Sequence, residues 1–150
     1  MKVICLGGTG GMGRYAARTA AAFDFVDEIV IADLNGTAAE AFASQLGEKA
    51  RGLAVDVRNP ELLDSVLARG DIVLNTVGPF FRFGVPILKA AMRTGRNYID
   101  LCDDWEPTLE MLDLHEEAAR AGITAVIGLG ASPGITNLLD GDRFTGSFGL

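Results

Sequence analysis

Short apolar runs alternate along the chain with longer stretches in which apolar residues recur at helical spacing. In six of these runs the hydrophobic residues are continuous rather than alternating with polar ones, which is typical of strands buried on both faces of a sheet. The predicted strands cover residues 3–6, 28–33, 51–57, 71–76, 97–101 and 123–129. The stretches between them predict helices over residues 12–23, 35–46, 60–69, 86–95 and 107–121.

Connections of this length do not form hairpins, so successive strands are expected to be parallel, with helices covering both faces of the sheet. Right-handed crossovers then predict an α/β fold of the Rossmann type, a doubly wound parallel sheet with the strand order 3-2-1-4-5-6. We expect this domain to cover residues 1–140. Residues 141–150 show no periodicity and are expected to be a tail, or the start of a second domain.

The first predicted strand stops at a glycine-rich turn, Gly7-Gly-Thr-Gly-Gly-Met-Gly13. Its spacing Gly8-x-Gly10-x-x-Gly13 is typical of a dinucleotide-binding turn, in which glycines permit a tight turn, a close approach of a pyrophosphate, and close packing of helix on strand. The free N–H groups of the following helix would face the bound anion. The residues predicted to contact the cofactor here are Gly8, Thr9, Gly10, Gly11, Met12 and Gly13. Glycine-rich loops also occur as plain turns, and Gly7-x-x-Gly10-x-x-Gly13 is the spacing of short-chain dehydrogenase relatives.

An acidic residue ends the second predicted strand, twenty positions after Gly13. At that place the carboxylate of Asp33, next to Leu34, would accept hydrogen bonds from both ribose hydroxyls of NAD. The same charge would repel a 2′-phosphate, and no arginine follows at positions 34 or 35, so NAD is favoured over NADP. The alternative is that Asp33 caps the next helix.

Two further strand ends are expected at the same edge of the sheet. Asp56 and Val57 either border the adenine or belong to an ordinary turn before Asn59-Pro60. The residues predicted to hold the second ribose and the nicotinamide follow the fourth strand, at the topological switch point: Asn75, Thr76, Val77, Gly78 and Pro79. The aromatic residues after them either shield the nicotinamide ring from water or pack on the core: Phe80, Phe81 and Phe83.

Composition narrows the class of protein. The chain has 150 residues, of which 49% are hydrophobic and 22% charged, as in one ordinary globular domain. The net charge of -7, without a basic cluster, argues against a nucleic acid or an anionic membrane as partner. The amino terminus lacks the apolar stretch of a signal peptide, so we expect a cytoplasmic protein.

The titratable residues outside the glycine turn offer little catalytic chemistry. Cys5 and Cys102 are expected about 10 Å apart, too far for a disulfide. The single histidine, His115, lies inside the apolar arc of its predicted helix, which favours a half-buried packed residue. With one histidine and no Cys-x-x-Cys pair no metal site is predicted. Cys102-Asp103 lies at the strand ends, where a capping or solvated role is favoured over substrate contact, so the catalytic residues remain unknown.

Taken together, several segments resemble the nucleotide-binding N-terminal domain of the saccharopine dehydrogenase family, including its lysine-dehydrogenase-like members. The segments are Gly7–Gly13, Ala32-Asp33, Asp56-Val57, Asn75-Thr-Val-Gly-Pro-Phe80, Asn97-Tyr-Ile-Asp100 and Gly130-Ala-Ser-Pro-Gly-Ile-Thr-Asn137. The resemblance implies reversible NAD(P)-linked oxidation of an amine or amino acid, a homodimer, and a second, substrate-binding domain. This domain alone would bind cofactor without turnover.

Two other interpretations stay open. A short-chain-dehydrogenase relative would carry a Tyr-x-x-x-Lys pair, but Tyr15 is followed by Thr19, and Tyr98 by Cys102. A non-catalytic NAD(P)-binding sensor is favoured by the absence of an obvious acid or base.

Overall fold

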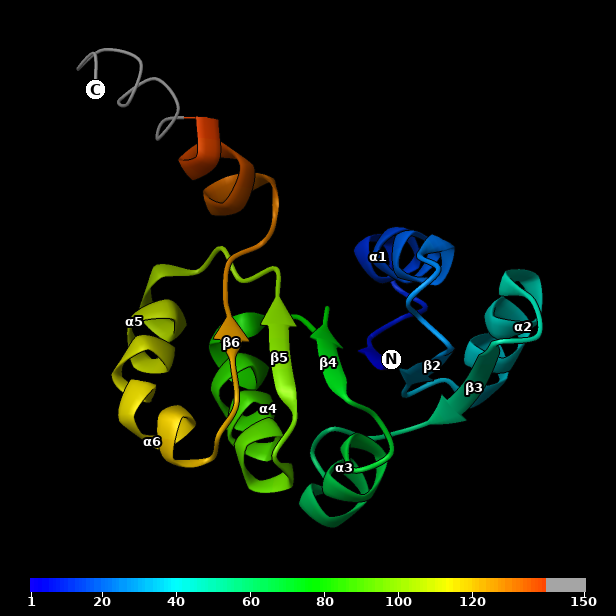
Figure 1. The fold of residues 1–150 in the computed structure, drawn as a ribbon, viewed down its shortest axis with the longest axis horizontal. Coiled ribbons are helices and arrows are strands. Elements are labelled where there is room, and N and C mark those ends of the chain that lie inside the picture. Colours follow the sequence, from blue (N-terminus) through cyan, green and yellow to red (C-terminus); the bar gives the residue numbers. More distant parts are fainter. Residues whose placement is uncertain (140–150) are drawn as a thin grey trace.

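The computed structural model describes residues 1–139, which form a parallel sheet of six strands with helices on both faces (Figure 1). The strand order is β3-β2-β1-β4-β5-β6, so the predicted topology is confirmed. The strands are β1 (Lys2–Leu6), β2 (Glu28–Asp33), β3 (Ala50–Ala54), β4 (Ile72–Asn75), β5 (Asn97–Asp100) and β6 (Ala125–Val126). The helices are α1 (Gly11–Ala22), α2 (Gly36–Leu46), α3 (Pro60–Leu67), α4 (Phe80–Thr94), α5 (Trp105–Asp113) and α6 (His115–Arg120). The expected tail at 141–150 lies outside the described residues.

The core has two layers because side chains of each strand point alternately to opposite faces. On one face, Cys5 and Ile31 of the central strands pack against Ala17 of α1 and Phe42 of α2. On the other face, residues such as Tyr98 of β5 pack against α3 and α4. Figure 1 shows α1 and α2 grouped apart from α3, α4, α5 and α6. Continuous apolar strands are therefore buried on both sides, as their pattern indicates.

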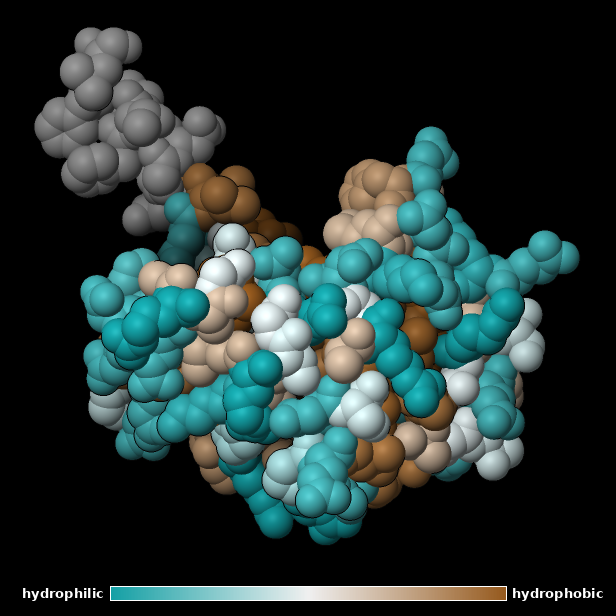
Figure 2. Space-filling model, turned by 60° about the horizontal axis from the view of Figure 1, so that its bottom comes forward, coloured by the Kyte–Doolittle hydropathy of each residue, from teal (hydrophilic) through white to brown (hydrophobic). Residues whose placement is uncertain are grey.

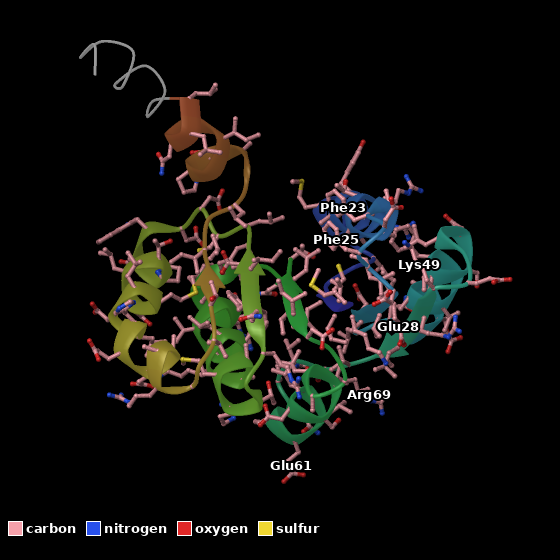
Figure 3. All side chains as sticks on the ribbon, viewed as in Figure 1. Phe23, Phe25, Glu28, Lys49, Glu61 and Arg69 are labelled. Atoms are coloured by element: carbon pink, nitrogen blue, oxygen red, sulfur yellow. The ribbon has the colours of Figure 1, made fainter. Side chains whose placement is uncertain are left out.

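The edge of the sheet opposite the glycine turn holds the connection from α1 to β2. Phe23 and Phe25 stack with ring centroids 4.9 Å apart, and Lys49 Nζ donates hydrogen bonds to the carbonyls of Phe23 and Val26 (Figure 3). Glu28 begins β2 next to them. These surface contacts hold the α1–β2 connection at the amino ends of the strands.

The helix starts that follow a capping asparagine agree with the sequence. Asn35 accepts a hydrogen bond from Ala38 N, and Asn59 accepts one from Leu62 N, so each side chain satisfies an amide that the helix cannot. Gly47 follows α2, with a positive φ of 98°. Residues within one turn of each boundary therefore determine where α2 and α3 begin and where α2 ends.

The helix predicted over residues 86–95 begins earlier, at Phe80, and carries Pro86 inside it, so the expectation that residues 80–84 belong to the loop before this helix was wrong. The carbonyl of Pro79 accepts the amides of Arg82 and Phe83 and so starts the helix. Phe80, Phe83 and Ile87 then form one apolar face against the core. Packing of this face outweighs the helix-breaking tendency of glycine and proline.

The single helix predicted over residues 107–121 is divided at Leu114, whose backbone (φ −83°, ψ 7°) leaves the helical region. Leu114 is buried while His115 is exposed, so the prediction of a half-buried histidine was wrong. The break changes the helical register and turns the residue after Leu114 outward.

Four strands are shorter than predicted: β3 ends at Ala54 rather than 57, β4 covers 72–75 rather than 71–76, β5 ends at Asp100 rather than 101, and β6 comprises only Ala125 and Val126. After β6, Ser132 has an extended backbone (φ −131°, ψ 129°), and residues 136–139 form an α-helix, near the predicted helix start at 135. Figure 2 shows hydrophobic side chains on the segment that adjoins the grey residues, where Ile135, Leu138 and Leu139 are exposed. None of the helices in residues 1–139 is long and apolar enough to cross a membrane.

Candidate dinucleotide site at the strand ends

The glycine turn folds back on itself between β1 and α1. Gly7 has a φ of +71°, and its amide donates to Ala32 O at 2.9 Å, while Gly10 N donates to Gly7 O at 3.0 Å. Gly10 is the N-cap of α1 and supplies no side-chain cap, and Gly10, Gly11 and Met12 are all exposed. The positive end of the α1 dipole therefore meets solvent at the carboxyl edge of the sheet, where an anion can be held.

At two positions of the turn, only glycine avoids a steric clash with neighbouring atoms. A Cβ at Gly13 would lie 2.2 Å from Gly7 O and 2.8 Å from Thr76 Oγ1, and a Cβ at Gly8 would lie 2.9 Å from Ile31 Cγ2. Gly11, in contrast, has no atom within 4 Å of a Cβ position. Gly13 thus lets α1 pack closely on the sheet, as predicted. The residue with the left-handed backbone of the turn is Gly7 rather than Gly8, and Gly8 is needed instead for its contact with Ile31 of β2.

Asp33 connects the end of β2 to the glycine turn. Its Oδ2 accepts hydrogen bonds from Thr9 Oγ1 at 2.6 Å and from Thr9 N at 3.1 Å. The N-cap of α2 is Asn35, so the alternative that Asp33 caps that helix is wrong. A half-buried carboxylate is thereby held beside the exposed start of α1.

A pocket lies between the ends of β1, β2 and β3 and the start of α4; we call it the β2–β3 pocket. Its lining residues are Gly7, Ala32, Asp33, Leu34, Val55, Asp56, Val57, Arg58, Val77, Gly78, Arg82 and Phe83. The structure therefore brings Asp33, Leu34, Asp56, Val57, Val77 and Gly78 together, as a cofactor site needs.

Asp56 is both a turn residue and a lining residue of this pocket. Its carboxylate accepts Arg58 N at 2.9 Å and pairs with the Arg58 guanidinium, with 2.7 Å from Oδ2 to Nη2. These hydrogen bonds, the side-chain one above all, lower the pKa of Asp56 to about 2. Asp56 thus belongs to the turn before Asn59-Pro60 and also lines the pocket proposed for the adenine, so the two alternatives do not exclude each other.

A second pocket, the β4–β6 pocket, lies on the other side of Gly78. It is lined by Met12, Thr76, Gly78, Phe80, Leu101, Asp103, Gly130, Ala131 and Ser132. Gly78 borders both pockets, and Met12 belongs to the first turn of α1. The two pockets and the exposed start of α1 form a track that runs across the topological switch point.

Not every predicted site residue faces this track. Asn75 is completely buried, with its side chain bonded to Val77 N and to the Tyr98 hydroxyl. Thr76 Oγ1 donates to Leu6 O at 2.8 Å while the residue still lines the β4–β6 pocket. Pro79 lines neither pocket and is the N-cap residue of α4.

Sequence reasoning missed several lining residues, including Arg58, Arg82, Leu101 and Ser132. The Asp56-x-Arg58 spacing could have indicated Arg58, since an arginine two positions after a strand-end aspartate can pair with it. Arg82 carried no such signal, because Phe80–Gly84 was predicted to be a loop. Of the aromatic residues, Phe80 and Phe83 pack on the core and Phe81 is exposed.

The thiols are buried and free of disulfides. Burial, and next the nearby Asp33 charge, raises the pKa of Cys5 to about 12, and burial also raises the pKa of Cys102. Within residues 1–139, no three His, Cys, Asp or Glu side chains are grouped as metal ligands would be. This edge is therefore suited to binding, with no activated nucleophile among its cysteines.

A family model described as "Saccharopine dehydrogenase NADP binding domain" matches residues 3–126 of the chain. The chain belongs to this family. Its fold is close to that of saccharopine dehydrogenase (L-Glu forming) from Saccharomyces cerevisiae, with a TM-score of 0.79 and 29% identity over 93% of this chain and 29% of the yeast one. The domain is thus a nicotinamide-dinucleotide-binding domain of an oxidoreductase family.

Curated relatives of the domain carry a different name. "Trans-acting enoyl reductase" proteins of Mycobacterium leprae and Mycobacterium ulcerans are 29% and 28% identical, over 85% and 86% of this chain. The chain spans 32% of the length of each. A short chain dehydrogenase/reductase family protein, 18% identical with a TM-score of 0.60, shares the fold.

Proposed function

We propose that the saccharopine-dehydrogenase-like domain binds its dinucleotide along the track across Gly78. The adenosine lies in the β2–β3 pocket, the diphosphate at the start of α1, and the nicotinamide in the β4–β6 pocket. The observation that carries this proposal is that one residue, Gly78, borders both pockets beside the exposed first turn of α1. A dinucleotide spans two such pockets with its anionic centre between them.

We further propose NAD as the preferred cofactor. The Asp33 carboxylate, oriented by Thr9, would accept ribose hydroxyls and repel a 2′-phosphate. The family description, which names NADP, and the guanidinium groups of Arg58 and Arg82 in the same pocket support the opposite preference. Because Asp56 already neutralises Arg58, Asp33 has the larger effect on selectivity.

Titration of the protein with NADH and NADPH tests both statements. NADH should bind more tightly, and Asp33→Ala should remove the difference between the two affinities. Asp24→Ala, at an exposed aspartate after α1, is the matched control and should leave the difference unchanged. Equal wild-type affinities would exclude Asp33 from ribose recognition, and absence of binding by either nucleotide would refute the site.

For the whole protein we propose hydride transfer between this cofactor and an amine or amino acid, as the family resemblance implies. The exposed apolar residues Ile135, Leu138 and Leu139 support a further domain packing on this segment. A cytoplasmic homodimer belongs to the same proposal. The domain itself would bind cofactor and leave substrate selection to the rest of the protein.

Reduction of an enoyl group is the second candidate, and the names of the mycobacterial relatives favour it. The two candidates predict different substrates and opposite changes in NADH absorbance. With the whole protein, an amino acid or amine and NAD should produce NADH if the first candidate holds, whereas an enoyl thioester should consume NADH or NADPH if the second does.

A further inference from the structure

The three loops that line the β4–β6 pocket are fastened by one set of buried side chains, Asn75, Tyr98 and Asp100. Asn75 Oδ1 accepts Val77 N at 3.0 Å in the loop after β4. Asp100 Oδ1 accepts Cys102 N at 3.1 Å in the loop after β5 and Gly128 N at 2.9 Å in the loop after β6. One backbone amide in each of the three loops thus donates a hydrogen bond to Asn75 or Asp100. We call these three side chains the Asn75–Tyr98–Asp100 network.

The Tyr98 hydroxyl joins the two ends of the network. It accepts a hydrogen bond from Asn75 Nδ2 at 2.9 Å and donates one to Asp100 Oδ2 at 2.8 Å. Burial, and next the Asp100 charge, hold the pKa of Tyr98 well above its usual range, so the hydroxyl keeps its proton and remains a donor. All three side chains are fully buried, so a lost partner cannot be replaced readily by bulk water.

Position in the sheet explains why these residues meet. Asn75 and Asp100 are register partners at the ends of β4 and β5, and Tyr98, two residues before Asp100, lies on the same face. None of the three residues lines either pocket. Their effect on a ligand therefore passes through the loops they hold.

We propose that Tyr98 and Asp100 are positioning residues for the nicotinamide half of the site. The proposal rests on the proposed function, because it assigns the nicotinamide to the β4–β6 pocket. The β2–β3 pocket shares only the Val77-Gly78 segment with these loops, and its remaining lining residues belong to other elements. Asn75 holds this shared segment through Val77 N, whereas the two loops that Asp100 holds border the β4–β6 pocket alone. Tyr98 and Asp100 therefore act mainly on the nicotinamide half.

Tyr98→Phe separates this role from a general effect on folding. We expect the affinity for NADH to fall about tenfold, the equivalent of about 1.4 kcal/mol, because Asn75 and Asp100 lose the hydroxyl that links and orients them. ADP-ribose, which lacks the nicotinamide, should bind within twofold of its wild-type affinity. Tyr15→Phe removes the hydroxyl of an exposed tyrosine on α1 and should change neither affinity.

A pair of variants at Asp100 tests the fastening of the loops if Tyr98→Phe does not fold. Asp100→Asn keeps an oxygen that can accept Cys102 N and Gly128 N, so NADH affinity should stay within threefold of wild type. Asp100→Ala removes this acceptor and should lose tenfold or more, with ADP-ribose affinity unchanged.

The outcomes distinguish this inference from the proposed function. If the wild-type protein binds neither NADH nor ADP-ribose, the proposed function is refuted. If both ligands bind the wild type, but Tyr98→Phe and Asp100→Ala weaken them equally or not at all, the positioning role is refuted and the proposed site stands.

Discussion

The two halves of the open sheet edge hold their loops by different means. On the β1–β2 side the shape comes from backbone contacts and from the absence of side chains, as where Gly13 lies against Gly7 O and Thr76. On the β4–β6 side it comes from buried side chains, Asn75, Tyr98 and Asp100, that accept or pass on hydrogen bonds. The first half presents free backbone amides at the start of α1, and the second holds its loops with side chains.

This difference determines which substitutions each half tolerates. A single methyl group can disrupt the glycine half, because the obstructing atoms belong to the backbone and cannot move aside. The side-chain half should tolerate isosteric changes that preserve an acceptor. The following experiments challenge that contrast, beginning with the largest expected effect.

Gly13→Ala should destabilise the protein by about 3 kcal/mol, because its Cβ would overlap Gly7 O at 2.2 Å. Gly11→Ala is the matched control: two residues earlier in α1, its Cβ would meet no atom within 4 Å, and a change within about 1 kcal/mol is expected. Urea unfolding followed by circular dichroism measures both. Similar stabilities for the two variants would show that the glycine turn does not depend on close packing.

Thr76→Val should cost about 1 kcal/mol, because Thr76 Oγ1 donates to Leu6 O across the junction of the two halves. The effect is smaller because Leu6 O also accepts Thr76 N and keeps a partner. Thr19→Val, at an exposed threonine of α1, should lie close to wild type in the same unfolding assay. Equal unfolding free energies for Thr76→Val and Thr19→Val would show that the Thr76 hydroxyl does not stabilise this junction.

The smallest expected effect is the pH dependence of stability that comes from Asp56 in the β2–β3 pocket. Hydrogen bonds from Arg58 lower the folded-state pKa of Asp56 to about 2, so its stabilising contribution is complete above the usual value of 3.8 and is lost as the pH falls toward 2. Arg58→Gln should return the NMR titration midpoint of Asp56 toward 3.8. Arg69→Gln, just beyond α3 (Figure 3), should leave the midpoint near 2. A midpoint unaffected by Arg58→Gln would mean that this ion pair does not form in solution.

Much of the fold could be predicted because local chemistry determines it. The continuous apolar strands, the Asn35 and Asn59 caps and the terminating Gly47 each act within a few residues. The beginning of α4 and the break at Leu114 could not be predicted in this way. There, packing of the Phe80–Ile87 face and burial of Leu114 outweigh the local preferences of glycine, proline and histidine.

The candidate site likewise has residues that could be predicted from local sequence and residues that could not. The glycine turn and Asp33 follow a spacing that the backbone physics of anion binding requires, so they could be predicted from sequence. Arg82 and the Asn75–Tyr98–Asp100 network depend on which strands become neighbours, and the positions of Tyr98 and Asp100 beside β4 emerge only from sheet register. Asn75 was interpreted as a cofactor contact, yet its side chain serves the network.

A crystal structure of the protein with NADH tests the central claim most directly. The account predicts adenosine beside Asp33 and Val57, the diphosphate at Gly10 and Gly11, and the nicotinamide between Met12 and Phe80. Density for the dinucleotide elsewhere, such as the groove lined by Leu88, His115 and Ile127, would contradict it, as would a strand edge that stays empty in excess NADH.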